Sequence, residues 1–209
     1  MKPALFISLS VAALAFYLSG RETLLGEVGR SFDGITLPTP QIPLTSPQIA
    51  ATVPNSPILF RPYAGKAQLT ASDARILISD IDNSYFGGWF AANVDSSDII
   101  GIWKTESGLR PAEINDQDPF GGAWGIGQVL ADVARIDYGI SPPALLLEVE
   151  TGARVSMQHI QSTIQRLIAS GVNPTFSAWA QAYNVGVAGY VSGRRNLGYL
   201  ALVTARRIV

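Results

Sequence analysis

The distribution of proline constrains this chain more than any other feature. Seven of its 13 prolines fall within the 27 residues from Thr36 to Pro62. Proline has no backbone N–H and a fixed φ, so this segment is incompatible with a helix or a central strand. We therefore expect an extended linker over residues 22–68, between an N-terminal segment and a folded body at residues 69–209. As polyproline II the proline-rich part reaches about 80 Å, at about 3.1 Å per residue.

The N-terminal segment is apolar. From Pro3 to Gly20 there are 18 residues without a charge, flanked by Lys2 and Arg21. A helix of this length spans about 27 Å, close to the hydrocarbon core of a bilayer at about 30 Å. We predict that residues 1–21 form a transmembrane anchor. The alternative is a cleaved signal peptide, because Ala13-Leu14-Ala15 fits a small-x-small cleavage site, although it lies inside the apolar run.

The body has helical periodicity and helix start signals, which predict a mostly α fold. No run of residues alternates for long enough to require a strand. Four short segments are placed to begin helices: Ser72-Asp73, Asp95-Ser96-Ser97, Pro142-Pro143 and Pro174. We expect helices over residues 74–82, 98–106, 144–170 (one helix or two), 175–184 and 198–208.

Composition excludes several classes of chemistry. The chain has no cysteine, so it has no disulfide, no thiol nucleophile and no cysteine-ligated metal. Its single histidine, His159, argues against a metal site, and we expect no metal and no cofactor. A hydrolytic metal site of Asp116, Asp118 and His159 lacks paired-histidine spacing. The formal net charge of −1 gives no reason to expect nucleic-acid binding.

Charge is unevenly distributed within the body. Thirteen acids and four bases lie between Asp73 and Glu150, whereas six arginines and no acids follow Glu150. In one interpretation the two halves pack together and their fields largely cancel. In the other, the C-terminal half presents a basic face to an anionic polymer or membrane surface. Loss of Arg206 and Arg207 would then weaken binding to an anionic cell wall.

Three short motifs can carry chemistry. Glu106 ends an apolar helix and is followed by Ser107-Gly108, so its carboxyl is expected to face a cleft from a rigid element. Apolar neighbours raise a carboxyl pKa, which suits a general acid. The second motif is the glycine-rich run 121–128, which ends in Gln128 and lacks the features of a phosphate-binding loop. The third is Ala-Tyr-Asn-Val-Gly at 182–186.

Together, in this order and in a helical domain, the motifs resemble the lytic transglycosylase domain of the soluble-lytic-transglycosylase type, related to goose-type lysozymes. Glu106-Ser107 corresponds to the family's Glu-Ser, residues 125–128 to its Gly-Leu-Met-Gln, and residues 182–186 to its Ala-Tyr-Asn-x-Gly. The resemblance covers roughly residues 94–190 and implies a lysozyme-like helical fold. One departure is Gly127, where a methionine is common, and we expect it to remove a side chain that lines the cleft.

The resemblance implies cleavage of the β-1,4 bond between N-acetylmuramic acid and N-acetylglucosamine in peptidoglycan, with formation of a 1,6-anhydro sugar. Glu106 is then the catalytic acid and base. The implied substrate-binding residues are Ser107, Gln128, Tyr183 and Asn184, with Tyr183 near Glu106 or the sugar. Trp103, Trp124 and Trp179 are candidate sugar platforms, of which at least two are expected to be packed in the core instead.

Two other functions stay open. Asp116 or Asp118, acting as a second carboxylate that activates water, would make the protein an inverting muramidase. The second is a membrane-anchored protein that binds glycan or has a structural role and has lost the activity. An anchored enzyme on a proline-rich linker fits local opening of the cell wall, in a phage virion or in a secretion or conjugation machine. Its expected partners are peptidoglycan strands, the membrane and proteins of such an assembly.

Overall fold

The computed structural model of the chain describes residues 62–117 and 121–207, and this part is mostly helical. The mostly α fold class is therefore confirmed. The predicted anchor at residues 1–21, most of the predicted linker and Asp118 lie outside the described residues. Within the described ranges, no helix combines the length and the apolar character needed to cross a bilayer.

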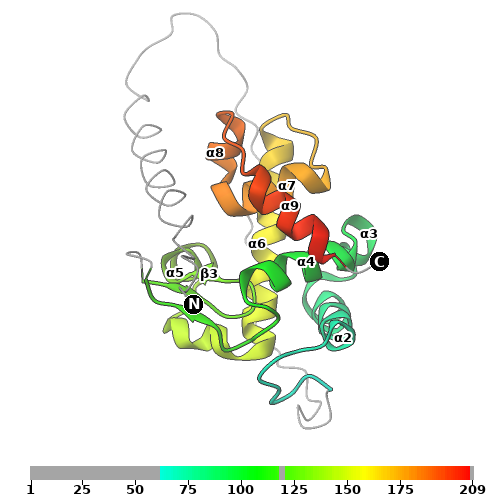
Figure 1. Cartoon of the computed structure of the whole chain (residues 1–209), viewed down its shortest axis with the longest axis vertical. Helices are drawn as coiled ribbons and strands as arrows, with labels where there is room; N and C mark the ends of the chain where they lie inside the picture. The colour runs from blue at the N-terminus through cyan, green and yellow to red at the C-terminus, as the bar shows by residue number, and fades with distance from the viewer. Residues whose placement is uncertain (1–61, 118–120, 208–209) are drawn as a thin grey trace, which may run out of the picture.

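Helix α6 (Val149–Ala169) is the centre of the domain. It runs the length of the folded part, with α7 (Phe176–Val185), α8 (Val187–Val191) and α9 (Leu197–Arg206) near its C-terminal half, while α5 (Ala131–Tyr138) and the small sheet lie near its N-terminal half (Figure 1). Small and apolar residues of α6 are buried at helical spacing, Ala153, Met157, Ile160, Ile164 and Leu167 among them. This spacing gives α6 a buried stripe against which the other elements pack.

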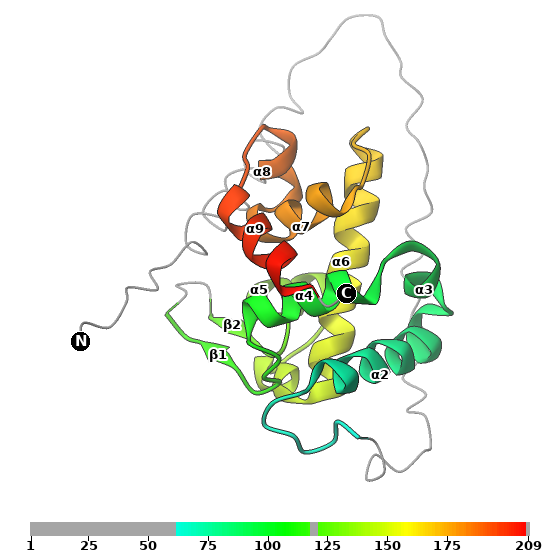
Figure 2. The same cartoon turned by 45° about the vertical axis from the view of Figure 1, so that its right-hand side comes forward.

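Helix α4 (Ser96–Glu106) packs between α2 (Ala71–Ile81) and α9 (Figure 2). Asp95 caps it as predicted, with its side chain accepting a hydrogen bond from the Ser97 N–H. Four consecutive positions of α4, Ile99 to Ile102, are fully buried, because elements cover more than one of its faces. Glu106 is therefore carried at the end of a helix that is fixed by burial.

Helix starts follow local signals, with some shifts from the predicted positions. The N-cap of α2 is Thr70, and Asp73 completes a capping box three residues later, so this helix begins before the predicted Ser72-Asp73 start. The expected segment 144–170 is divided into a 3₁₀ turn, η3 (Pro143–Leu147), and α6. Between α2 and α4 lie a π-helical turn, η2 (Asp82–Phe86), and the short helix α3 (Trp89–Asn93).

A small antiparallel sheet that the sequence did not predict follows α4. Its strands β1 (Ile114–Asn115), β2 (Ala123–Trp124) and β3 (Val129–Leu130) pair in chain order, with Trp124 opposite both Ile114 and Val129. Two-residue strands contain too little alternation to be recognised in a sequence. The sheet presents the glycine-rich turn 125–128 to the end of α4.

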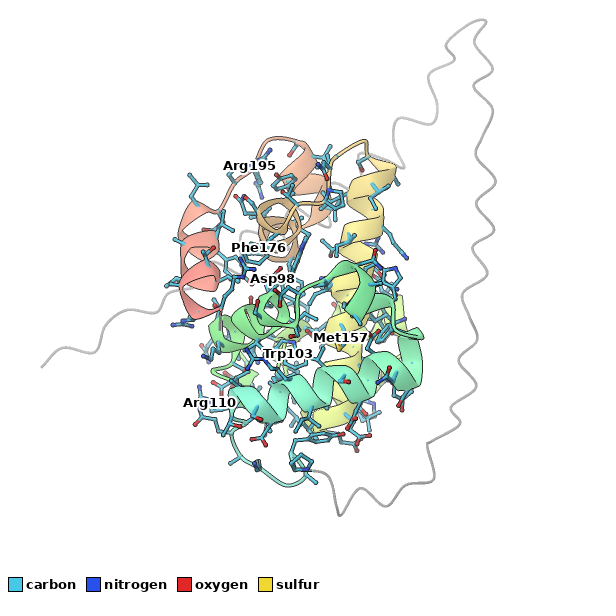
Figure 3. The ribbon with its side chains drawn as sticks, turned by 90° about the vertical axis from the view of Figure 1, so that its right-hand side faces the viewer. Asp98, Trp103, Arg110, Met157, Phe176 and Arg195 are labelled. Atoms are coloured by element: carbon cyan, nitrogen blue, oxygen red, sulfur yellow. The ribbon has the colours of Figure 1, made fainter. Side chains whose placement is uncertain are left out.

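The core extends upstream of residue 69 and joins the two oppositely charged halves. Tyr63 is fully buried, and its hydroxyl donates to Asp80. Arg207 forms an ion pair with Asp98 at 2.5 Å, and its guanidinium carbon lies 4.6 Å from the centre of the Phe176 ring, so the acidic and basic halves contact each other here. Figure 3 labels Asp98 and Phe176 in this region. Arg207 therefore does not belong to a free basic face.

Candidate active site

The Glu106 carboxyl lies in a wall of an open cleft of about 650 Å³. Burial raises the pKa of this carboxyl from 4.5 to about 7, opposed by a hydrogen bond from Tyr199. At neutral pH a substantial fraction of Glu106 is therefore protonated, and the group can give a proton and take it back. The expectation that this carboxyl faces a cleft agrees with this geometry.

Tyr199 holds the Glu106 carboxyl, and sequence reasoning did not select it. Its hydroxyl donates to Glu106 Oε1 at 2.5 Å from the first turn of α9, 93 residues along the chain. Burial, followed by the charge of Glu106, keeps the pKa of Tyr199 well above its ordinary value, so the phenol stays a donor. The sequence marks Tyr199 only as a polar side chain near the start of an otherwise apolar helix, just after Asn196.

The first two motifs meet through Ser107. This serine is 2% exposed, and its hydroxyl lies 2.8 Å from the carbonyl of Ile126 and 3.1 Å from that of Trp103. It also accepts a hydrogen bond from the Arg110 N–H. In this position the hydroxyl of Ser107 fastens the end of α4 to the glycine-rich turn. Ser107 also lines the Glu106 cleft, and its predicted role in substrate binding stays a prediction.

Tyr183 joins the third motif to the second. Its hydroxyl donates to the carbonyl of Gly127 at 2.7 Å and lies 3.3 Å from Ser156 Oγ, which in turn accepts from the Trp103 indole N–H at 2.9 Å. Because Trp103 can only donate, the chain of donors runs from Trp103 through Ser156 and Tyr183 to Gly127. Tyr183 is near enough to Glu106 for that charge to raise its pKa, after the larger effect of burial.

Gly127 does not remove a cleft side chain, which corrects the expectation from the sequence. A Cβ at this position would lie 2.1 Å from Ser156 Oγ and 3.1 Å from the Tyr183 hydroxyl, so it would point into the interior. Glycine is required here because the buried hydrogen bonds leave no room for a methyl group. The nearby Gly125 has a similar constraint, since its Cβ would meet the carbonyl of Leu146 at 2.3 Å.

Gln128 and Asn184 are both occupied by contacts within the protein. The Gln128 amide donates to the carbonyls of Glu113 and Gly125, and this side chain lines neither of the two cavities described here. The Asn184 side-chain carbonyl accepts from the Asn196 amide at 2.8 Å. Their predicted roles in substrate binding stay predictions, and Asn184 is the better placed because it lines a cavity.

That second, smaller cavity measures about 80 Å³. Tyr183 and Asn184 line it together with His159, Arg166 and apolar residues of β3, α5 and α8. Burial lowers the pKa of His159 to about 4, and its Nδ1 is 2.9 Å from the Tyr138 hydroxyl. His159 is thus a neutral, hydrogen-bonded group near the third motif, and among the described residues no cluster of side chains can hold a metal ion.

The Asn184 contact also reaches Glu106 indirectly. Asn196, which donates to Asn184, caps α9 by accepting a hydrogen bond from the Tyr199 N–H at 2.9 Å. Tyr199 in turn donates to Glu106. The third motif therefore holds the start of α9, the helix whose Tyr199 donates to Glu106.

Of the three candidate tryptophans, two are packed in the core, as expected from the sequence. Trp103 and Trp179 are 0% and 3% exposed, so both are packed in the core (Figure 3 shows Trp103 in the interior). Trp124 is half-buried on β2, and its indole N–H donates to the carbonyl of Gly121 at 2.7 Å. Of the three, Trp124 alone retains the exposure that a sugar platform needs.

The candidates for a second carboxylate are not equivalent. Asp116 is exposed, its carboxylate accepts from Gln117, and it does not line the Glu106 cleft. Glu113 does line that cleft, but its carboxylate accepts from Arg110 at 2.9 Å. Glu113 is a cleft residue that the sequence motifs did not reveal.

Comparison with known proteins gave no family: the chain matches no protein-family model, no curated protein and no solved structure. Functional inference therefore rests on the site itself. The site consists of one half-buried, protonatable carboxyl at a cleft wall, held by a tyrosine and framed by three sequence motifs that contact one another.

Proposed function

We propose that the protein is a peptidoglycan lytic transglycosylase that cleaves the β-1,4 bond between N-acetylmuramic acid and N-acetylglucosamine. The observation that carries the proposal is the raised pKa of Glu106, about 7, on a carboxyl that lines an open cleft. A general acid in glycoside cleavage must be protonated at working pH and must then ionise, and this pKa permits both. The order and mutual contact of the three motifs add support.

In the proposed mechanism Glu106 donates its proton to the glycosidic oxygen as the bond from C1 of muramic acid breaks. The 2-acetamido group of the same sugar supports the positive charge that develops at C1, so a second carboxylate is not needed. The ionised Glu106 then takes the proton from the C6 hydroxyl as that oxygen closes on C1. The products are a 1,6-anhydromuramic acid end and a free N-acetylglucosamine hydroxyl, and no water is consumed.

Tyr199 serves this cycle as a positioning residue. Its hydrogen bond to Glu106 Oε1 is stronger when the carboxylate is ionised, so it stabilises the state in which Glu106 acts as a base. The opposing effect of burial prevents the acid from staying ionised. The pKa of about 7 is the balance of these two effects.

Product analysis tests the proposal directly. The full-length protein and its Glu106→Gln variant are incubated with purified glycan strands, and the products are measured by mass spectrometry. We expect 1,6-anhydro ends from the wild type and a rate lower by about 10²–10⁴ in the variant, the range typical of a lost general acid. Equal cleavage by the two proteins would remove Glu106 from the mechanism.

The other two functions give different results in the same assay. Reducing ends that carry an oxygen atom from solvent and are first formed as the α anomer would indicate the inverting muramidase, for which Glu113 is the described carboxylate that shares the cleft. Binding of glycan without any cleavage by the wild type would indicate an inactive binding protein. The exposed position of Asp116 away from the cleft gives it no support as the second carboxylate.

For the biological setting we propose an envelope-associated enzyme, tethered by residues 1–21 and spaced from the membrane by the proline-rich segment. The apolar run and the proline cluster of the sequence support this arrangement. Local opening of the cell wall, during phage entry or assembly of an envelope-spanning machine, is the task that such a tether would serve. Membrane flotation of the full-length chain against a chain lacking residues 1–21 tests the anchor.

A further inference from the structure

The cleft beside Glu106 has an electropositive wall. Lys104 lies in the last turn of α4, Arg110 follows this helix, and Arg206 reaches the same cleft from the last turn of α9. The carboxyls that line the cleft are Glu106, which is only partly ionised near neutral pH, and Glu113. Cations therefore outnumber ionised carboxylates at this wall.

Two of these cations lack an anionic partner among the described residues. Arg110 is neutralised, because its Nη2 donates to Glu113 at 2.9 Å. Arg206 donates to an uncharged acceptor, the carbonyl of Lys104, at 2.9 Å. The Lys104 ammonium makes no hydrogen bond or ion pair with residues 62–117 and 121–207.

A purely structural role explains only part of this arrangement. A cation at the C-terminus of a helix is stabilised by the helix dipole and can donate to a carbonyl of the last turn, as Arg206 does for α4. That role needs one cation. Lys104 and Arg206 both line the cleft, so the wall carries a second positive side chain that this role does not use, and an anion in the cleft would be attracted to both.

The cations do not determine the pKa of the acid. The pKa of Glu106 is set by its burial and by Tyr199, and neither Lys104 nor Arg206 is among the groups that perturb it. Positive charge close to the carboxyl would have favoured its ionised form and so disabled a general acid. The electropositive wall can thus attract a negative group on the substrate while Glu106 keeps its proton.

We propose that Lys104 and Arg206 bind a carboxylate on the lactyl-peptide side chain of the muramic acid residue that occupies this cleft. This inference rests on the proposed function and deepens it. In a peptidoglycan strand the sugars and the scissile bond are uncharged, and the negative charge is carried by the substituent of every second sugar. Recognition of that charge selects muramic acid over N-acetylglucosamine and so determines which glycosidic bond lies over Glu106.

The test measures binding of full-length protein, made inactive by Glu106→Gln, to three glycans. These are strands with peptide stems, strands from which an amidase has removed the stems to leave lactyl carboxylates, and neutral chito-oligosaccharide. Adding Lys104→Gln and Arg206→Gln should weaken binding to acidic strands about tenfold and leave the neutral oligosaccharide unaffected. The difference should shrink in high salt, because exposed charges are screened.

Two matched variants separate charge from stability. Lys104→Gln alone preserves the Arg206 hydrogen bond that caps α4, so it removes one charge without removing the cap. Arg195→Gln removes an exposed arginine that lines neither cavity, at the end of the domain away from Arg110 (Figure 3), and should bind all three glycans as before. Melting temperatures of all variants are measured alongside.

The outcomes are distinct. Weaker binding to stem-bearing strands only assigns the wall to a stem carboxylate, and weaker binding to amidase-treated strands only assigns it to the lactyl carboxylate. Weaker binding to both acidic strands shows that the wall accepts either carboxylate, and each of these results supports the proposal. The proposal is overturned if the variant's binding to the neutral oligosaccharide is weakened as much as its binding to the acidic strands, or if its binding to every glycan is unchanged. If Glu106 is restored and no strand is cleaved, the proposed function fails, whereas normal cleavage with unchanged binding in the variants refutes the electropositive wall alone.

Discussion

Replacing Glu106 by glutamine should stabilise the folded protein in a pH-dependent way, whatever the reaction is. The folded-state pKa of Glu106 is about 7 because burial disfavours the ionised carboxyl, while the ordinary value is 4.5. In the unfolded chain the group ionises at the lower value. Between pH 4.5 and about 7 the carboxyl is mostly ionised in the unfolded chain and mostly protonated in the folded protein, so folding takes up a proton. Above this range folding buries the ionised carboxylate. Glutamine has the same shape, can accept the Tyr199 hydrogen bond and never ionises.

The size of the effect follows from the two pKa values. The cost of Glu106 to folding is nearly absent below pH 4.5, grows between pH 4.5 and 7 and is complete above about pH 7. At about 1.36 kcal/mol per pKa unit it is about 0.4 kcal/mol at pH 4.5 and about 3 kcal/mol at pH 8. Glu106→Gln should then raise the melting temperature at pH 8 by about 6 °C or more.

The assay is denaturant unfolding of wild type and Glu106→Gln at pH 4.5 and at pH 8, with the melting temperature as a second measurement. Asp116→Asn is the matched control. Its carboxylate is exposed and so remains hydrated in the folded state, and this variant should change stability little at either pH. A Glu106→Gln gain that is equal at the two pH values, or a loss at pH 8, would refute the inference that burial raises this pKa.

Three further substitutions test the surroundings of the acid. Tyr199→Phe removes a hydrogen bond that lowers the pKa of Glu106, so the alkaline limb of the pH–rate profile should move up, by about one unit for about 1.4 kcal/mol of lost interaction. Gly127→Ala places a Cβ 2.1 Å from Ser156 Oγ and should cost about 1–3 kcal/mol in denaturant unfolding. Arg207→Gln breaks an ion pair with a buried aspartate and should lower the melting temperature by several degrees.

Each of these has a matched control. Tyr63→Phe removes another hydroxyl that donates to a carboxylate, away from both cavities, and should leave the pH–rate profile unchanged. Gly198→Ala places its Cβ at an ordinary contact distance of 3.6 Å within α9 and should not destabilise. Arg206→Gln removes an exposed neighbour of Arg207 and should cost less stability. Where a control behaves like its partner variant, the explanation given for that partner is wrong.

The sequence predicted the elements whose signals are local. Asp95 caps α4, Thr175 follows Pro174 to cap α7, and the buried periodicity of α6 is visible in its residues. These features depend on interactions within a few residues, so sequence pattern alone can identify them. The position of Glu106 at the end of an apolar helix could be predicted for the same reason.

What the sequence did not reveal depends on contacts between distant residues. Tyr199 reaches Glu106 because α9 packs on α4, and nothing near Tyr199 in the sequence marks that contact. Nothing near Ser107 in the sequence indicates that its hydroxyl lies within hydrogen-bonding distance of two backbone carbonyls, one of them in the glycine-rich turn. Gly127 could not be understood without Ser156, which fills the space beside it from α6. Packing of this kind is decided by the whole fold.

The contact between α4 and α9 also orders events during synthesis of the chain. Glu106 is translated early in the folded body, while Tyr199 and the cleft cation Arg206 come from its last helix. Until residues 197–206 have been made and have docked, the acid lacks its hydrogen-bond donor and the cleft lacks part of its positive wall. A nascent or truncated chain that ends before α9 would therefore carry the carboxyl without its finished surroundings. The surroundings of Glu106 are thus completed only when α9 has docked on α4.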